Sequence, residues 1–118
     1  MRWDADALTS LYAEDATIES PLVHYLLRTD DGICAGRKAI REFIPLVSKH
    51  RPDGRPTHRN PVFTDGHTMM WEYPRETPDG DQMDSTEVME FKDGLIQRHR
   101  VYWGWYGVRT LASGSHRR

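Results

Sequence analysis

The sequence predicts one α+β domain in which N-terminal helices cover one face of an antiparallel sheet. Two patterns predict this class. Apolar residues recur at helical spacing twice in the first fifty residues, and the later residues form strand-like segments that are separated by turn signals. The 118 residues, 37% of them hydrophobic, are enough for one buried core and too few for two. We expect this domain over residues 1–111 and a flexible tail over 112–118.

Two helices are expected, over residues 4–13 and 36–50. Asp4 is a suitable N-cap for the first helix, and Pro45 is expected to bend or shorten the second. Each segment has an apolar stripe at intervals of three and four residues. The stripes consist of Ala7, Leu8, Leu11 and Tyr12 in the first segment and of Ile40, Phe43, Ile44 and Val47 in the second.

The remaining chain predicts strands and turns. A brief strand over 16–20 ends at Pro21, and residues 22–36 are expected to form a long loop that carries at most a short hairpin. Aspartate-glycine pairs at 65–66, 79–80 and 93–94 indicate tight turns. They separate four expected strands, over 57–64, 67–76, 82–91 and 95–106, which form an antiparallel meander.

The last expected strand has apolar residues on both faces. Tyr102 and Tyr106 alternate with His99, Val101, Trp103 and Trp105. Helices can cover only one face of a sheet, so the other face is expected to be buried between two copies of the chain. The sequence therefore predicts a homodimer.

Charge and cysteine content narrow the possible partners. The net charge is −2, which argues against binding to nucleic acid or to an anionic membrane surface, and no apolar run approaches the ~20 residues that span a bilayer. The single cysteine, Cys34, rules out an internal disulfide and suits the reducing cytoplasm. We expect a cytoplasmic protein whose partner is a small hydrophobic ligand or substrate.

Cofactor motifs are missing from the sequence. The histidines at 50, 58, 67 and 116 do not have the spacing of a metal site, and no glycine-rich phosphate loop occurs. We expect neither a metal nor a nucleotide cofactor.

Four segments resemble the SnoaL-like family, and most specifically its ketosteroid-isomerase-like members, which share a fold with nuclear transport factor 2. The similarity extends from Asp4 to about Val108 and implies a curved, cone-shaped antiparallel sheet that is backed by the N-terminal helices and surrounds an apolar pocket. The superfamily includes isomerases, cyclases, dehydratases, epoxide hydrolases and non-enzymatic binding modules, so the resemblance leaves the reaction open. The segments are DATIESP at 15–21, GRKAIREF at 36–43, DGLI at 93–96 and VYW at 101–103.

The resemblance also indicates where the carboxylates of the family would lie. The base of ketosteroid isomerases corresponds to Ser20, and their acidic oxyanion-hole donor to Glu87. The aspartate of cyclases and epoxide hydrolases of this family corresponds to Val101. An earlier helix that supplies a tyrosine in ketosteroid isomerases has no counterpart in this sequence. Two of the three family carboxylates are therefore replaced.

The last hairpin suggests an acid/base pair. If residues 92–94 form a three-residue loop with Phe91 opposite Leu95, then Glu87 lies opposite His99 on one face. A two-residue loop would place Arg100 opposite Glu87 instead and form an ordinary salt bridge. A carboxylate beside an imidazole in an apolar pocket can exchange a proton near neutral pH, although a buried structural pair has the same pattern.

Several other side chains are expected to line the pocket. The face of Glu87 also includes Ser85, Met89, Val101 and Trp103, and Ser20 and His24 are expected at the pocket mouth, where turn and surface roles are the alternatives. A tight turn at 79–80 would place Glu72 opposite Glu87. A loop of odd length would turn Trp71 and Tyr73 inward instead, which we favour because apolar residues normally take the buried face.

These patterns predict a cofactor-independent enzyme that acts on a small hydrophobic metabolite by proton transfer, with Glu87 and His99 as the catalytic residues. Isomerisation, cyclisation, dehydration and hydrolysis are all compatible with this chemistry. The alternative is a non-catalytic ligand-binding or dimerisation module of the same fold.

Overall fold

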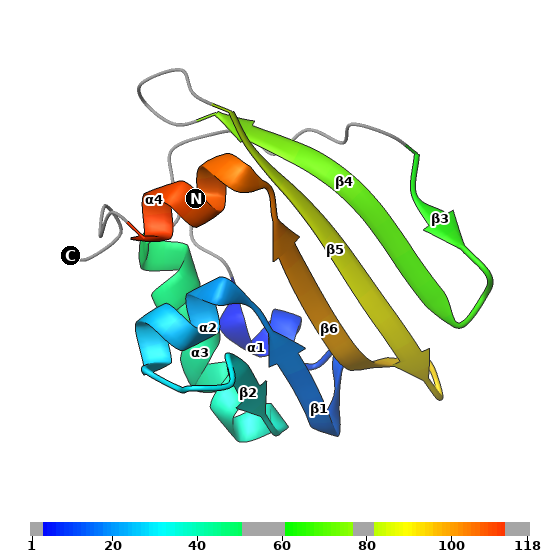
Figure 1. Ribbon diagram of the computed structural model, residues 1–118. Helices are drawn as coiled ribbons and strands as arrows, with labels where there is room; N and C mark the ends of the chain where they lie inside the picture. The colour runs from blue at the N-terminus through cyan, green and yellow to red at the C-terminus, as the bar shows by residue number, and fades with distance from the viewer. Residues whose placement is uncertain (1–3, 51–60, 77–81, 113–118) are drawn as a thin grey trace.

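Helices lie on one side of a curved, unclosed sheet of six strands in the computed structural model, which describes residues 4–50, 61–76 and 82–112 (Figure 1). The strand order is β2-β1-β6-β5-β4-β3, and the α+β class is confirmed. The sheet is mixed rather than antiparallel throughout, because β1 runs parallel to β6. The elements are α1 (Ala5–Thr9), β1 (Tyr12–Glu19), α2 (Pro21–Leu27), β2 (Ile33–Ala35), α3 (Arg37–His50), β3 (Phe63–Thr64), β4 (Thr68–Glu76), β5 (Gln82–Lys92), β6 (Leu95–Trp103) and α4 (Trp105–Ala112).

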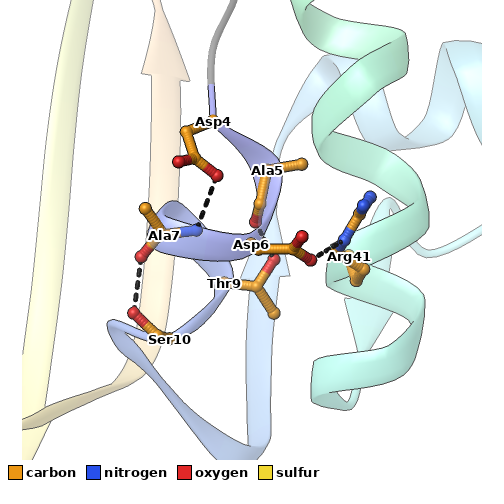
Figure 2. Close-up of polar contacts among 7 residues, drawn as sticks. All are labelled: Asp4, Ala5, Asp6, Ala7, Thr9, Ser10 and Arg41. Carbon is orange, nitrogen blue, oxygen red and sulfur yellow. Dashed lines mark hydrogen bonds and ion pairs between the residues drawn. The ribbon is translucent and has the colours of Figure 1, made fainter.

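The first helix is shorter than expected. Asp4 does cap it, since its Oδ1 accepts a hydrogen bond of 3.0 Å from the backbone N–H of Ala7 (Figure 2). At the other end, the hydroxyls of Thr9 and Ser10 donate to backbone carbonyls four and three residues earlier. These two hydrogen bonds lie in the last turn of the helix. The chain then enters β1, so Tyr12 is a strand residue and not part of a helical stripe.

The segment over 22–36 contains a helix and a strand where a loop was expected. Ser20 caps α2 by accepting a hydrogen bond from the N–H of Leu22, and Pro21 occupies the first helical position. α2 is only seven residues long and apolar on most sides, so it shows little helical period. It ends at Arg28 in the left-handed conformation (φ 57°), and β2 then pairs antiparallel with β1.

The helix α3 packs on β1 and β2 and supplies the centre of the core (Figure 1). Ile40 is completely buried, and Pro45 lies inside the helix on its exposed side without ending it. Arg41 Nε lies 2.6 Å from Asp6 Oδ1 and connects α3 to α1 (Figure 2). The other buried core residues come from five elements and are Tyr12, Ala16, Ile18, Val23, Cys34, Phe43, Ile44 and Ile96.

The strands β4, β5 and β6 form the expected antiparallel meander. The strand expected over 57–64 is limited to Phe63–Thr64 among the described residues, while 57–60 lie outside them. A turn at Asp65 leads into β4. Its Oδ1 accepts hydrogen bonds from the N–H groups of His67 and Thr68, and these bonds lower the pKa of the Asp65 carboxyl.

The last strand ends earlier than expected and is followed by α4. Gly104 lies between the two, and its N–H donates to the carbonyl of Asp84 at 2.8 Å. A Cβ at Gly104 would approach Asp84 Cβ to 3.3 Å, so glycine permits this close turn against β5. Trp105 is consequently an exposed helix residue instead of an inward-facing strand residue. The predicted tail begins too early, because Ala112 belongs to α4; residues 113–118 lie outside the described part.

Candidate active site

One face of the sheet holds most of the predicted site residues in three neighbouring rows across β4, β5 and β6, whereas Ser20 and His24 lie at α2. This face, here called the inner face, continues the packing surface of Ile18, which contributes to the core beneath α3. Directly opposed residues point to the same side of a sheet, so each row shares this face. The rows are Met69, Met89 and His99; Trp71, Glu87 and Val101; and Tyr73, Ser85 and Trp103.

The hairpin that carries Glu87 and His99 has a different loop from the one expected. Lys92 pairs with Leu95, so the loop contains two residues, Asp93 and Gly94, and not three. Both adopt positive φ (54° and 79°), as a tight hairpin turn of this length favours. The expected pairing of Phe91 with Leu95 is therefore wrong.

A β-bulge nevertheless returns His99 to the expected face. A regular strand after this loop would have placed Arg100 opposite Glu87. The pairing slips by one residue between Ile96 and the next paired position, which leaves Gln97 as the extra residue of β6. Ile96 and His99 are consequently both buried although they are three residues apart. Glu87 and His99 end up as diagonal neighbours on one face.

The carboxylate of Glu87 and the imidazole of His99 form a short polar contact. Their Oε1 and Nε2 atoms lie 2.5 Å apart, and the side chains are only 16% and 10% exposed. At this distance a hydrogen bond joins the carboxyl to the imidazole, two groups that can each carry a proton. The pair is therefore a candidate for holding and releasing a proton in a largely buried setting.

The other ring nitrogen of His99 contacts Tyr12, which the sequence analysis did not place in the site. The hydroxyl of Tyr12 lies 2.8 Å from Nδ1, and the two rings stack with centroids 6.0 Å apart. Burial raises the pKa of Tyr12 above its ordinary value, and the negative charge of Glu87 raises it further. Tyr12 was missed because its spacing from Leu8 and Leu11 fits a helix. The available signal was that a buried tyrosine hydroxyl needs a hydrogen-bond partner.

The aromatic residues of β4 follow the register that we favoured. Trp71 lies opposite Glu87, and Tyr73 lies opposite Ser85, so both positions belong to the inner face. Trp71 is half-buried. For Tyr73 the structure describes the backbone but not the side chain. Glu72 is exposed on the other face and is not a second acid of the site.

A hollow of about 360 Å³ opens beside these rows, between α2, the loop before β2 and the end of β6. It contains four of the expected pocket residues: Ser20, His24, Val101 and Trp103. Val101 is the direct cross-strand neighbour of Glu87, although neither Glu87 nor His99 is among the described residues that line the hollow. The other described residues that line it are Glu19, Pro21, Asp30, Asp31, Gly32, Tyr102 and Val108.

Ser20 and His24 also have structural roles. Ser20 is buried, and its Oγ caps α2, which agrees with the turn role considered for it. His24 is exposed, and its Nδ1 lies 2.6 Å from the carbonyl oxygen of Thr29. Both residues are also among those that border the hollow.

Within the described part of the chain, no group of three or more histidine, cysteine, aspartate or glutamate side chains could hold a metal ion. His58 and His116, two of the histidines considered earlier, lie outside that part. The buried thiol of Cys34 has a raised pKa because of its burial, so it stays protonated. None of the described helices is long and apolar enough to cross a membrane.

Comparison with known proteins identifies the family. The model of the SnoaL-like domain matches residues 2–99. No curated protein matches the chain. Among solved structures, an NTF2-like protein of unknown function from Mesorhizobium loti is similar, with 24% identity, a TM-score of 0.66, and coverage of 86% of this chain and 78% of that one.

Two further structures have the same fold at lower identity. A SnoaL-like protein of unknown function from Burkholderia thailandensis is 18% identical, with a TM-score of 0.67 and coverage of 86% of this chain and 81% of that one. TerC, co-crystallised with polyporic acid, is 18% identical, with a TM-score of 0.68 and coverage of 93% of this chain and 86% of that one. The match of the family model over most of the sequence, together with this fold, shows that the chain belongs to the SnoaL-like family.

Proposed function

We propose that this protein is a cofactor-independent enzyme that transfers a proton to or from a small hydrophobic metabolite, with Glu87 as the acid/base group and His99 as its partner. The observation that supports this function is the 2.5 Å contact between Glu87 Oε1 and His99 Nε2 on the inner face. SnoaL-like proteins include isomerases and cyclases, enzymes whose reactions move a proton on a carbon skeleton.

Glu87 is the member of the pair assigned to the substrate. Both ring nitrogens of His99 already contact protein groups, Glu87 and Tyr12, so the imidazole is better placed to exchange a proton with Glu87 than with a ligand. A carboxylate can accept about four hydrogen bonds, so the bond from His99 takes up only part of the capacity of Glu87. In this assignment Glu87 removes a proton from the substrate, His99 stabilises the resulting protonation state, and Ser20 is an auxiliary donor.

The hollow beside Val101 supports a small, uncharged or weakly polar substrate. Its described lining combines apolar and aromatic side chains, including Val101, Trp103 and Val108, with the carboxylates of Glu19, Asp30 and Asp31. The described lining includes no lysine or arginine, so anionic substrates would be repelled. TerC, with the same fold, was co-crystallised with polyporic acid, which is consistent with a small-molecule site. A cytoplasmic location belongs to the same proposal and rests on the single cysteine.

The test is turnover by the purified protein and two matched variants on a panel of terpenoid, steroid-like and polyketide-like compounds. Glu87→Gln removes the acid/base group, and Glu90→Gln makes the same change on the opposite face of β5. We expect Glu87→Gln to lower kcat by about 10²-fold to 10⁴-fold, the usual contribution of general acid/base catalysis. Glu90→Gln should stay within about twofold of the parent. A folded Glu87→Gln protein with full turnover would overturn the assignment.

A non-catalytic ligand-binding module is the second candidate. It is favoured by the residues at the family carboxylate positions, because Ser20 serves as a helix cap and Val101 is apolar. In this case a compound should raise the melting temperature and be recovered chemically unchanged after prolonged incubation. Product formation by the parent protein, lost in Glu87→Gln, would exclude it.

A homodimer through the other face of the sheet is part of the proposal. Three large apolar side chains on this face are exposed: Phe63 by 58%, Met70 by 42% and Tyr102 by 50%. Phe63 and Met70 are direct cross-strand partners and form a continuous apolar strip. Sedimentation equilibrium should give twice the chain mass, and Met70→Asp should shift it toward the monomer. A monomeric parent at high micromolar concentration would contradict this assembly.

A further inference from the structure

Tyr12 contacts the histidine of the proposed acid/base pair from the side opposite to the carboxylate. Its hydroxyl lies 2.8 Å from His99 Nδ1, while Glu87 Oε1 lies 2.5 Å from Nε2. The three side chains come from β1, β6 and β5, three adjacent strands of the sheet. They form one hydrogen-bonded row in which the imidazole is the central member.

Tyr12 is held in this position by several independent contacts. Arg37, the first residue of α3, donates from Nε and Nη2 to the Tyr12 carbonyl oxygen at 3.1 and 2.7 Å. The phenol ring is 7% exposed and stacks on the imidazole at an interplanar angle of 24°. The hydroxyl therefore has a fixed distance to Nδ1 and is free only in the direction of its proton.

Rotation of the hydroxyl proton lets Tyr12 form a hydrogen bond with either protonation state of His99, but the two bonds differ in strength. When His99 is neutral and Glu87 is ionised, Nε2 carries the ring proton, and the Tyr12 hydroxyl donates to Nδ1. When His99 is charged, Nδ1–H donates to the Tyr12 oxygen instead. Hydrogen bonds to charged groups contribute about twice as much as neutral ones, so the second arrangement gains more from Tyr12.

We propose that Tyr12 is a positioning residue that stabilises the imidazolium form of His99 and thereby keeps the shared proton on the histidine and Glu87 ionised. This inference rests on the proposed function, because it assigns the base form of the pair to Glu87. Tyr12 acts through His99 and does not touch the substrate. The phenol itself stays protonated, since burial and the Glu87 carboxylate both raise the pKa of Tyr12.

The charged and titratable groups near His99 can be named among the residues that the structure describes. Its direct neighbours across the strands, Ile18 and Met89, are apolar. The thiol of Cys34 from β2 interacts electrostatically with Tyr12 and is protonated, because its own pKa is raised by burial and by Glu42 of α3. The cations that flank His99 in sequence, Arg98 and Arg100, interact with Glu90. Tyr12 and Glu87 are therefore the groups expected to set the titration of His99.

The test is an NMR titration of the His99 ring in ¹⁵N-histidine-labelled protein without any ligand. Tyr12→Phe keeps the ring and removes only the hydroxyl, and Tyr102→Phe makes the same change on the other face of β6. We expect Tyr12→Phe to lower the titration midpoint of His99 by about half to one pH unit, which corresponds to a difference of about 1 kcal/mol. Tyr102→Phe should leave the midpoint within about 0.2 pH units of the parent. A midpoint in folded Tyr12→Phe that is unchanged or higher would overturn the inference.

A measurement on the parent protein covers the case in which Tyr12→Phe does not fold. At a pH where His99 is charged, the Nδ1–H proton should be slow to exchange with water and show a nuclear Overhauser effect to the Tyr12 ring. A rapidly exchanging Nδ1–H would overturn the inference. The titration needs no substrate, so it separates this inference from the proposed function: Glu87→Gln can retain turnover while Tyr12→Phe shifts the midpoint, or the reverse.

Discussion

The hairpin of β5 and β6 carries, on each of its faces, a glutamate in contact with a basic side chain, and the contacts on the two faces differ in exposure and in consequence. On the inner face, Glu87 and His99 are 16% and 10% exposed. On the other face, Glu90 contacts Arg100 at side-chain exposures of 35% and 20% and lies 3.5 Å from Arg98. The inner pair joins a carboxyl to an imidazole, which can be neutral or charged, whereas arginine stays charged at every accessible pH.

This comparison indicates that environment and partner, rather than the carboxylate alone, determine what such a pair can do. The outer pair is a permanent ion pair that water and salt weaken, and the Arg100 guanidinium beside Glu90 holds the pKa of that carboxyl below its usual range. The inner pair joins a carboxyl and an imidazole, between which a proton can move, and burial makes each protonation state sensitive to its neighbours. Of the two pairs, the inner one has the composition that the proposed acid/base chemistry needs.

The largest contrast is expected when one partner of each pair is removed. His99→Ala leaves both the Glu87 carboxylate and the Tyr12 hydroxyl without this buried partner, and we expect it to lower the free energy of unfolding by about 3 kcal/mol. Arg100→Ala removes a partly exposed pair and should cost less than about 1 kcal/mol. Urea denaturation monitored by circular dichroism measures both. Equal losses would show that the two faces do not differ as described.

A smaller effect is expected from a second carboxylate on the inner face. Val101→Asp places a charge directly opposite Glu87 on the neighbouring strand β6. We expect it to be less stable than Val101→Asn by about 1 kcal/mol at pH 7, because like charges opposed across strands repel. The difference should shrink as the pH falls and one carboxylate takes up a proton. Thermal denaturation of the two variants between pH 4 and 8 tests this, and a difference independent of pH would contradict it.

The smallest effect is expected on the free energy of unfolding when acid protonates Glu90 and so weakens its ion pair with Arg100. Folding lowers the pKa of Glu90, so its contribution to stability is present above the unfolded value of 4.5 and is lost as the pH falls through the lower folded value. Glu90→Gln should therefore be less stable than the parent by no more than about 1 kcal/mol at pH 7 and equal to it near pH 2. Added salt should also reduce the difference at pH 7. A deficit that grows on acidification would have the wrong sign.

Local patterns in the sequence were sufficient for much of the fold. The stripe that includes Ile40 and Phe43 predicted α3, and the Asp-Gly pairs predicted the turns between β3 and β4 and between β5 and β6. The preference of apolar residues for a buried face also gave the right register for β4, with Trp71 inward and Glu72 outward. These features depend on residues close together in the chain.

The features that were missed depend on distant contacts or on single inserted residues. The bulge at Gln97 has no signature in the sequence, yet it compensates for the wrong loop length and brings His99 to the face of Glu87. The parallel pairing of β1 with β6 joins segments about eighty residues apart, and it is this pairing that brings Tyr12 to His99. The contact between Glu87 and His99 was therefore expected for a reason that was partly wrong, and the third member was not expected.

The most direct test of the account is whether Glu87 and His99 act as one unit in turnover. Once the panel has identified a substrate, kcat/KM is measured for the parent, Glu87→Gln, His99→Gln and the double variant. If the pair shares one proton, each single substitution removes the same proton-transfer step. The kcat/KM of the double variant should then be no more than about threefold below that of Glu87→Gln. Losses that multiply in the double variant, or a folded Glu87→Gln protein as active as the parent, would contradict the central claim.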